Sequence, residues 1–473
     1  MLFDENEFNS YDNAEHKARK AFELYEDGKI SQALTEIEAA LQINPANSSW
    51  HFDKALTLDA VNKFDEAIVE YEAALELSPD DVEALNCLAV DYTRTCQYDR
   101  AIATFEYIQQ LDAQFEPCYC NRIIAYTEMG QHELAEQMFY LSQQIEPDCA
   151  LCYYNIGNSL FMQGRYAKAV SCWLKTAELE PAHPQINYRI AQACWADGDL
   201  ARAHEYFLTE LRIDPGNVDV IFDFGLLLLE AGDIESAKEK FHRILELSPD
   251  YPQALFYLGE IAFANSDYAK AVELFKRVLE KDSMLSGPSY RLGQYALMTG
   301  DTKLARNYLV TEMELAGVDA SVWVSMASMF LNIASTVFDN RQQFGVGLRG
   351  GAEHSRNSNL EYAACCLESA LQADFANADA YYYLGLLAAM RGRFSEAAQS
   401  FMHCLDIRPD SVPALKGCAA ALLGMGRMDQ VAEKVAQAEA LGCADDQLKM
   451  LKRKIKFARL KNRMSDFLRK LRP

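Results

Sequence analysis

Long hydrophobic runs are missing from this 473-residue chain. No apolar stretch reaches the roughly 18 residues that a transmembrane helix needs, so no membrane span is expected. The N-terminus reads Met-Leu-Phe-Asp-Glu-Asn-Glu and lacks an apolar core segment, so no secretory signal is expected either. Half of the residues are hydrophobic and 24% are charged, which is typical of a folded, soluble protein rather than a disordered one.

Basic residues are scarce: 45 Lys and Arg stand against 69 Asp and Glu, for a net charge of −24. The basic residues are also unevenly distributed along the chain, because residues 449–473 hold eleven Lys and Arg against one acid, Asp466. The acidic body would repel nucleic acids and anionic membranes, so no nucleic-acid partner is expected. Only the basic C-terminal segment could make a peripheral membrane contact.

Features that signal disulfides, metal sites or catalysis are also sparse. The 13 cysteines are odd in number and irregularly spaced, which favours a reducing compartment, and we expect a cytoplasmic protein. The eight histidines do not cluster, and no Ser/His/Asp or paired-carboxylate pattern stands out. We therefore expect no enzyme, no metal and no cofactor.

What the sequence does contain is a 34-residue period, set first by its prolines. Six of them are 34 or 68 residues apart: Pro45, Pro79, Pro147, Pro181, Pro215 and Pro249. Aligned on these, position 8 of most units is small: Ala21, Ala55, Ala89, Gly157, Ala191, Gly225, Gly259 and Gly293. Position 20 is alanine at Ala33, Ala67, Ala101, Ala135, Ala169, Ala203, Ala237, Ala271 and Ala305.

Two further positions complete the pattern. Position 24 carries a large ring: Tyr71, Phe105, Phe139, Trp173, Phe207, Phe241 and Phe275. Position 15 carries a glycine that would end the first helix: Gly28, Gly130, Gly164, Gly198, Gly232 and Gly300. The pattern resembles the tetratricopeptide repeat, a helix–turn–helix unit of 34 residues.

The resemblance implies an all-α fold, a right-handed superhelical solenoid of antiparallel helix pairs with a C-terminal capping helix. We expect an N-terminal extension at 1–13, followed by units 1–9 and the first helix of unit 10 at 14–334. An insertion with Gly and Arg at 335–359 comes next. The second helix of unit 10 and units 11–12 follow at 360–442, and a basic capping helix at 443–473.

The candidate binding surface is a stripe on the first helices of units 5–9, formed by positions 5, 6, 9 and 12. It combines aromatic anchors with polar groups that could pair with a ligand's backbone. Its predicted members are Tyr154, Asn155, Asn158, Phe161, Tyr188, Arg189, Gln192, Trp195, Phe222, Asp223, Phe256, Glu260, Phe263, Tyr290, Arg291 and Gln294. Packing of position 5 against the neighbouring unit is the alternative.

Some members of the family hold the C-terminal carboxylate of chaperones in a clamp of Lys, Asn and Arg. Asn155 and Arg189 match two of its positions, whereas Cys120, Ile124 and Gln185 do not, so this ligand is not expected. The insertion is interpreted as a loop, either mobile or docking on a partner. Its Gly345, Gly347 and Gly350 form a G-x-G-x-x-G, but no strand is expected before it, so nucleotide binding is not expected.

Four cysteines are close in sequence, namely Cys118, Cys120, Cys149 and Cys152. Zinc needs its ligands to converge on one point, and the starts of successive first helices are not expected to do so. The functional prediction is a non-catalytic scaffold or adaptor that binds a peptide or helix of a partner protein. The alternative is a regulatory, targeting or chaperone subunit of an enzyme or secretion complex. Pairing of two arrays into a dimer stays open.

Overall fold

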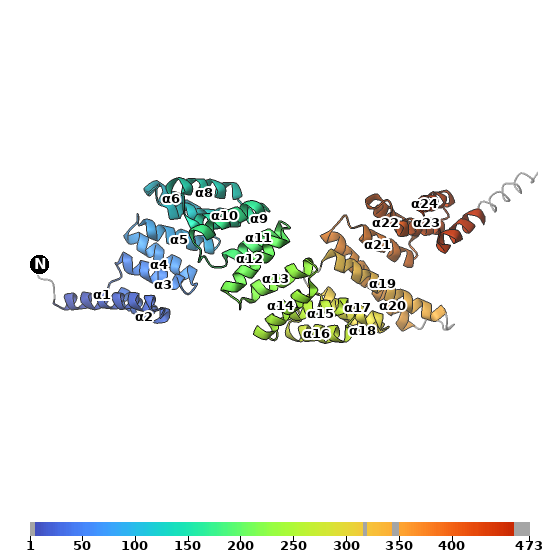
Figure 1. Ribbon diagram of the computed structural model, residues 1–473, viewed down its shortest axis with the longest axis horizontal. Coiled ribbons are helices and arrows are strands. Elements are labelled where there is room, and N and C mark those ends of the chain that lie inside the picture. Colours follow the sequence, from blue (N-terminus) through green and yellow to red (C-terminus); the bar gives the residue numbers. More distant parts are fainter. Residues whose placement is uncertain (1–4, 316–318, 343–349, 458–473) are drawn as a thin grey trace, which may run out of the picture. The chain divides into compact units, whose positions relative to one another are not determined.

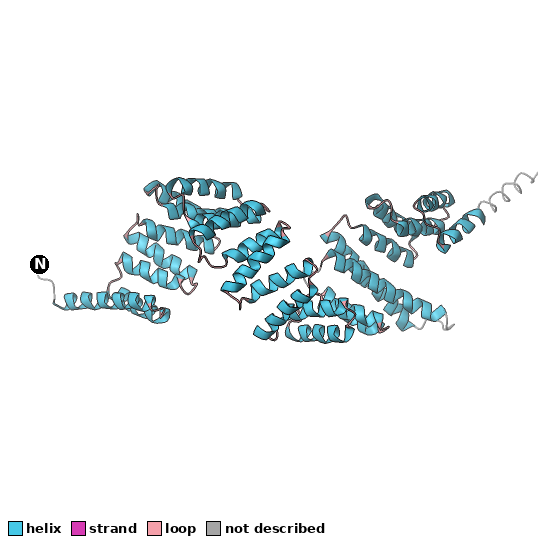
Figure 2. Cartoon of the chain, in the orientation of Figure 1, coloured by secondary structure: helices cyan, strands magenta, loops and turns pink. Residues whose placement is uncertain are grey.

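Helices that pair in the order of the sequence make up this protein, as a computed structural model shows (Figure 1). The structure describes residues 5–315, 319–342 and 350–457. Within these ranges there are helices and loops but no strands (Figure 2). The prediction of an all-α fold of paired helices is therefore confirmed.

The chain divides into two compact units, Met1–Lys240 and Phe241–Pro473, and α14 (Ile234–Leu247) contains the boundary. The helices of the first unit are α1 (Glu5–Glu26), α2 (Ile30–Ile43), α3 (Ser48–Asp59), α4 (Phe64–Leu77), α5 (Val82–Arg94), α6 (Tyr98–Leu111), α7 (Glu116–Glu128), α8 (His132–Ile145), α9 (Ala150–Met162), α10 (Tyr166–Leu179), α11 (Ile186–Ala196), α12 (Leu200–Ile213) and α13 (Val218–Glu230).

The second unit continues the same alternation of first and second helices. Its helices are α15 (Pro252–Ala264), α16 (Tyr268–Lys281), α17 (Pro288–Met298), α18 (Thr302–Met313), α19 (Ala320–Gln342), α20 (Gly350–Ala373), α21 (Ala378–Met390), α22 (Phe394–Ile407), α23 (Val412–Gly424) and α24 (Met428–Ala440). A last helical stretch covers 446–457.

In several repeats the large residue at position 24 lies against the small residue at position 8 of the same helix pair. Trp173 and Phe275 are almost fully buried. A Cβ added to Gly259 would come within 2.6 Å of the Phe275 ring, and one added to Gly157 within 2.4 Å of Trp173. Both distances are shorter than a carbon contact allows, so these two pairs require glycine.

Position 15 ends the first helix because it takes a left-handed backbone conformation. Gly130 has φ 70°, and the residue after it, Gln131, donates its N–H to the carbonyl of Tyr126, which closes the helix end. The same conformation occurs without glycine at three position-15 residues, Asn62, Cys96 and Ser266, with φ between 60° and 63°. The turn is therefore set by the repeat rather than by glycine alone.

Unit 10 differs from the prediction, because its insertion is largely helical. The first helix, α19, was expected to end near Ile333, but it runs on to Gln342, and α20 begins at Gly350. The two long helices pack side by side (Figure 1). The reason lies at position 15, where Ala334 is buried within α19 in place of a left-handed residue. The loop interpretation is wrong for 335–342 and 350–359, and residues 343–349, with Gly345 and Gly347, lie outside the described residues.

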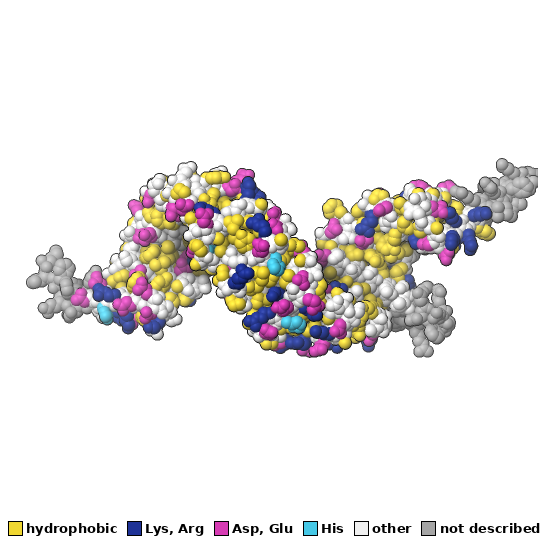
Figure 3. Space-filling model, in the orientation of Figure 1, with side chains coloured by type: hydrophobic (Ala, Val, Ile, Leu, Met, Phe, Trp, Pro, Cys, Tyr) yellow, Lys and Arg dark blue, Asp and Glu magenta, His cyan; other side chains and the backbone are white. Residues whose placement is uncertain are grey.

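Both ends of the described chain are helical. The first helix of unit 1 begins at Glu5, so most of the predicted extension at 1–13 belongs to it. At the other end, Leu448, Leu451 and Ile455 are buried in one cluster with residues of α23 and α24. The helix over 446–457 thus covers the apolar face of the last repeat, as a capping helix does. Lys and Arg side chains gather on its outer side (Figure 3), and residues 458–473 lie outside the described residues.

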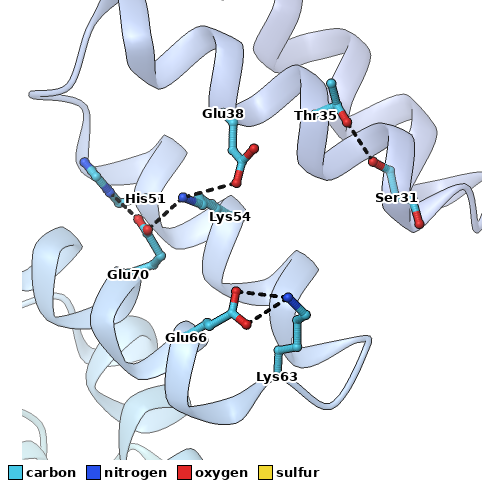
Figure 4. Close-up of polar contacts among 8 residues, drawn as sticks. All are labelled: Ser31, Thr35, Glu38, His51, Lys54, Lys63, Glu66 and Glu70. Atoms are coloured by element: carbon cyan, nitrogen blue, oxygen red, sulfur yellow. Dashed lines mark hydrogen bonds and ion pairs between the residues drawn. The ribbon is translucent and has the colours of Figure 1, made fainter.

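Neighbouring repeats are also joined by charged side chains, as the second repeat illustrates (Figure 4). The Lys54 Nζ of α3 lies 2.8 Å from Glu70 of α4 and 3.6 Å from Glu38 of α2. His51 Nδ1 lies 2.7 Å from the other oxygen of Glu70. Burial acts to raise the pKa of Glu70, but the hydrogen bonds with Lys54 and His51 outweigh it, so that this pKa is lowered.

Candidate functional site

The predicted stripe lies on the first helices α9, α11, α13, α15 and α17. Asn155 is buried, with 4% of its surface exposed, and every other member is partly exposed. The stripe is shared between the two compact units: α9, α11 and α13 belong to the first, and α15 and α17 to the second. We describe the two parts separately.

The aromatic residues of the stripe pack on the second helix of their own unit. The Tyr188 ring lies 6.1 Å from that of Phe207, and the Phe256 ring lies 5.9 Å from that of Phe275. From the other end of the first helix, Phe161 approaches Trp173 at 5.8 Å and Phe263 approaches Phe275 at 6.5 Å. The ring at position 24 thus lies between the rings at positions 5 and 12. The rings at positions 5 and 12 remain partly exposed.

In the first repeat of the stripe, the position-5 residue Tyr154 makes a polar contact with the position-24 residue Trp173. Tyr154 receives a hydrogen bond on its carbonyl from Trp173 Nε1 at 3.1 Å, and its ring lies 4.5 Å from that of His183. Asn158 lies one turn further along α9 and is partly exposed. In α13, Phe222 takes the same place as Tyr154 and Tyr188 and is partly exposed as well.

Polar members of the stripe link α11 to α13. The Tyr188 hydroxyl donates to Asp223 Oδ2 at 2.7 Å, and Gln192 Nε2 donates to the same oxygen at 3.1 Å. Burial and this hydrogen bond raise the pKa of Tyr188 above its ordinary value. At the end of α11, Trp195 Nε1 donates to Glu230 at 2.6 Å. Arg189 contacts Gln192 at 3.5 Å, so the surface is polar but largely satisfied by its own neighbours.

In the second compact unit, α15 and α17 are joined by an ion pair. Arg291 donates from Nε and Nη2 to the two oxygens of Glu260, at 2.7 and 2.5 Å, and from Nη1 to Gln294 at 2.9 Å. Its guanidinium also lies over the rings of Phe263 and Tyr290, 5.2 and 5.4 Å from their centres. These two rings and the planar guanidinium form a flat, partly exposed platform.

Asn155 differs from the other members because its amide is used inside the protein. Its Nδ2 donates to the carbonyl of Cys120 at 3.3 Å and to the sulfur of Cys120 at 3.4 Å. The buried amide of Asn155 is thus used within the protein and does not face an approaching ligand.

A cleft lies elsewhere, between α19, α21 and the start of α23, and sequence reasoning missed it. It has a volume of about 820 Å³. Three serines of α19 line it, Ser321, Ser325 and Ser328. Opposite them are Tyr382 and the ion pair between Arg408 and Asp379, at 2.9 Å. The signal was present in the sequence, since small serines stand at positions 6 and 9, where units 5–9 carry larger residues.

A second correction concerns the cysteines. Contrary to our expectation, one ligand atom each of Glu116, Cys120, Cys149 and Cys152 lies within 4.8 Å of all the others. The helix starts do converge, because α7 and α9 pack against each other and Cys152 Sγ lies 2.9 Å from Glu116 Oε1. Cys118 is not in this group, and its Sγ lies 3.2 Å from the carbonyl of Phe105.

Comparison with known proteins identifies the repeat. Two sequence models described as tetratricopeptide repeats match the chain, one at residues 125–218, 222–283 and 349–411 and the other at 60–94. Together they cover more than half of its length. No curated protein matches the chain.

Solved structures also match the chain at low identity. Yeast Tom70 is 14% identical, with a TM-score of 0.43, over 89% of this chain and 99% of that one. A tetratricopeptide repeat protein from Parabacteroides merdae is 17% identical, also with a TM-score of 0.43, over 52% and 96%. The Cut9–Hcn1 hetero-tetramer gives 12% identity and a TM-score of 0.40 over 93% and 96%. In the described part of the chain, no helix has the length and hydrophobicity needed to cross a membrane.

Proposed function

Because the chain belongs to the tetratricopeptide repeat family, we propose that it is a non-catalytic scaffold or adaptor that binds a segment of a partner protein on its first-helix stripe. Tetratricopeptide repeats commonly mediate protein–protein interactions. The observation that carries the proposal is the exposed face of the stripe's rings. Tyr154, Tyr188 and Phe222 take the same place in three successive repeats and stay partly exposed beside hydrogen-bonding groups.

The proposed ligand is an amphipathic helix or an extended peptide with apolar anchors and basic residues. Rigid rings that are already packed on one side offer contact area at little cost in conformational entropy, as aromatic anchors do in protein interfaces. The acidic surface of the chain would attract basic residues of the ligand and speed association, an effect that salt screens. All 13 cysteines lie in described residues and are free thiols, which supports a reducing compartment such as the cytoplasm.

The test is capture of partners by the full chain, followed by binding measurements with the captured protein. Tyr188→Ala and Phe222→Ala should each weaken binding by about 30-fold, the effect of losing an aromatic hot spot. Asn158→Arg, which adds bulk and charge to the stripe without removing a packed ring, should weaken it as well.

The matched control is Tyr140→Ala on the second helix α8, where the ring is 62% exposed. It should leave binding unchanged. Circular dichroism of every variant would show that the helices are intact. If the folded stripe variants bind as tightly as the unchanged chain, the stripe is not the binding surface.

A further inference from the structure

Four metal-ligating side chains meet where repeat 4 joins repeat 5. They come from three places: Glu116 and Cys120 from α7, Cys149 from the residue that precedes α9, and Cys152 from the first turn of α9. Cys120 and Cys152 are buried, whereas Cys149 and Glu116 are partly exposed. The cluster thus has two ligands fixed in the interior and one side open to an entering ion.

The spacing of these atoms suits a tetrahedral metal site. Zinc–sulfur bonds of about 2.3 Å place tetrahedral sulfur ligands about 3.8 Å apart. The three sulfurs and the carboxylate oxygen all lie within 4.8 Å of one another. A contraction of about 1 Å at most would therefore bring every ligand to bonding distance, which rotation of cysteine side chains can provide.

Two of the three sulfurs already accept a hydrogen bond that would support a thiolate. Asn155 Nδ2 donates to Cys120 Sγ at 3.4 Å, and the backbone N–H of Cys152 donates to Cys149 Sγ at 3.4 Å. Glu116 Oε1 accepts from the hydroxyl of Ser142 at 2.7 Å and from Cys152 Sγ at 2.9 Å. Such second-shell donors orient ligands and stabilise their charge, and the N-terminus of α9 adds a favourable dipole.

Cys149 differs from the capping residues that several other repeats carry directly before a first helix. In four of them this position is held by Asn47, Asp81, Asn217 and Asn377, whose side chains cap the helix. Cysteine is a weak substitute for these residues as a cap. Ser142 stands in α8 at a place that is polar and buried in other repeats as well, as Thr176 and Glu210 show.

We infer that Glu116, Cys120, Cys149 and Cys152 form a structural zinc site that ties repeat 4 to repeat 5. Three sulfur ligands and one carboxylate suit Zn²⁺, whereas Mg²⁺ and Ca²⁺ prefer oxygen alone. Binding forms three Zn–S bonds and one Zn–O bond and releases the thiol protons to solvent. With four protein ligands the coordination is complete, so the site holds the repeats together rather than catalysing a reaction.

The test measures zinc in the full chain, purified under reducing, anaerobic conditions, by elemental mass spectrometry and by titration with Zn²⁺ against a chromophoric chelator. We expect one zinc ion per chain. Cys149→Ser, a near-isosteric change at a partly exposed residue, and Cys120→Ala should abolish its retention. Ser142→Ala should weaken zinc binding by about 10- to 100-fold, as the loss of a second-shell partner does.

Two cysteine variants outside the cluster serve as controls. Cys118→Ala removes a buried thiol from the same helix, and Cys96→Ser an exposed one; both should keep one zinc per chain. Cobalt substitution should give a charge-transfer band with the intensity of three thiolates. The proposal is overturned if the unchanged chain retains no zinc, if the folded Cys149→Ser and Cys120→Ala variants retain it equally, or if the fresh chain carries a Cys149–Cys152 disulfide instead.

Discussion

At the scale of single residues, the repeat places some side chains in conformations or surroundings that their own chemistry does not favour. Position 15 demands a left-handed backbone, which glycine adopts freely and a residue with a Cβ does not. Cys96 and Ser266 adopt it with φ 60° and 63°. These residues are strained by the repeat's geometry.

Replacing Cys96 with glycine should therefore stabilise the chain by about 1 kcal/mol, the cost of a left-handed non-glycine residue. Chemical denaturation monitored by circular dichroism would measure it. Asn62→Gly is the comparison, because asparagine tolerates this conformation better, and its gain should be smaller. Loss of stability in Cys96→Gly would show that the thiol does more than occupy the turn.

Asp91 is the second such residue, because its side chain is fully buried. Oδ1 lies 3.2 Å from Arg94, while Oδ2 finds no hydrogen-bond partner among the described residues. Burial, together with the negative charge of Asp59, raises the pKa of Asp91 to about 7. Between the unfolded pKa of about 3.9 and this value, the folded chain binds the extra proton, so stability falls as the pH rises through that window.

Asp91→Asn removes this penalty. Because each pKa unit is worth about 1.4 kcal/mol, the variant should gain about 3 kcal/mol more stability at about pH 8 than at about pH 5. Unfolding curves of both proteins at the two pH values would measure the difference. An equal gain at both values would mean that Asp91 is ionised throughout.

At the scale of elements, a helix ends where the repeat provides a stop and continues where it does not. The left-handed residue at position 15 ends α7 and α9, whereas Ala334 lets α19 run on to Gln342. At the end of the array, the helix over 446–457 covers the face that a further repeat would otherwise bury. Asp445, directly before this helix, lies 2.6 Å from Lys416 and adds a charged contact with α23.

Leu451→Ala should destabilise the last repeats by about 3 kcal/mol, since Leu451 is 1% exposed and its loss leaves a cavity. Lys449→Ala is the control in the same helix, because that side chain is 62% exposed and should change stability by no more than about 0.5 kcal/mol. Thermal unfolding of the full chain would compare them. Equal stability of both variants would show that this helix does not cap the array.

At the scale of the whole molecule, stability in a repeat array comes from contacts within units and between neighbours. A ligand that binds one junction therefore acts locally first, by favouring the folded form of the repeats that it touches. The proposed zinc site lies between α7 and α9, in the compact unit Met1–Lys240.

Addition of zinc should slow hydrogen exchange in α7, α8 and α9 and leave α19 to α24 unchanged. Exchange measured by mass spectrometry with and without a chelator would map the effect. The Cys149→Ser chain should show no change on either treatment. Slowing spread evenly over the chain would mean that zinc acts through nonspecific binding or association rather than through this junction.

The stripe shows how far a repeat pattern predicts a site. The alignment placed Tyr188 and Phe256 on one side of their helices, because a helical period assigns faces, and both are partly exposed. It could not show that Arg291 is paired with Glu260, or that Asn155 is used by Cys120, since these bonds join residues 31 and 35 apart. The role of the stripe in binding stays a prediction.

The period of 34 residues was sufficient to determine the all-α fold and the order of the helix pairs, because these follow from local spacing and side-chain size. Only the structure showed that Phe275 packs on Gly259 of its own repeat. Only the tertiary structure showed that α19 continues past Ala334 and that the serines of α19 line a cleft. It alone brought Glu116, Cys120, Cys149 and Cys152 together. Their convergence depends on how two helices pack across a repeat junction, a distance in space that the spacing along the chain does not contain.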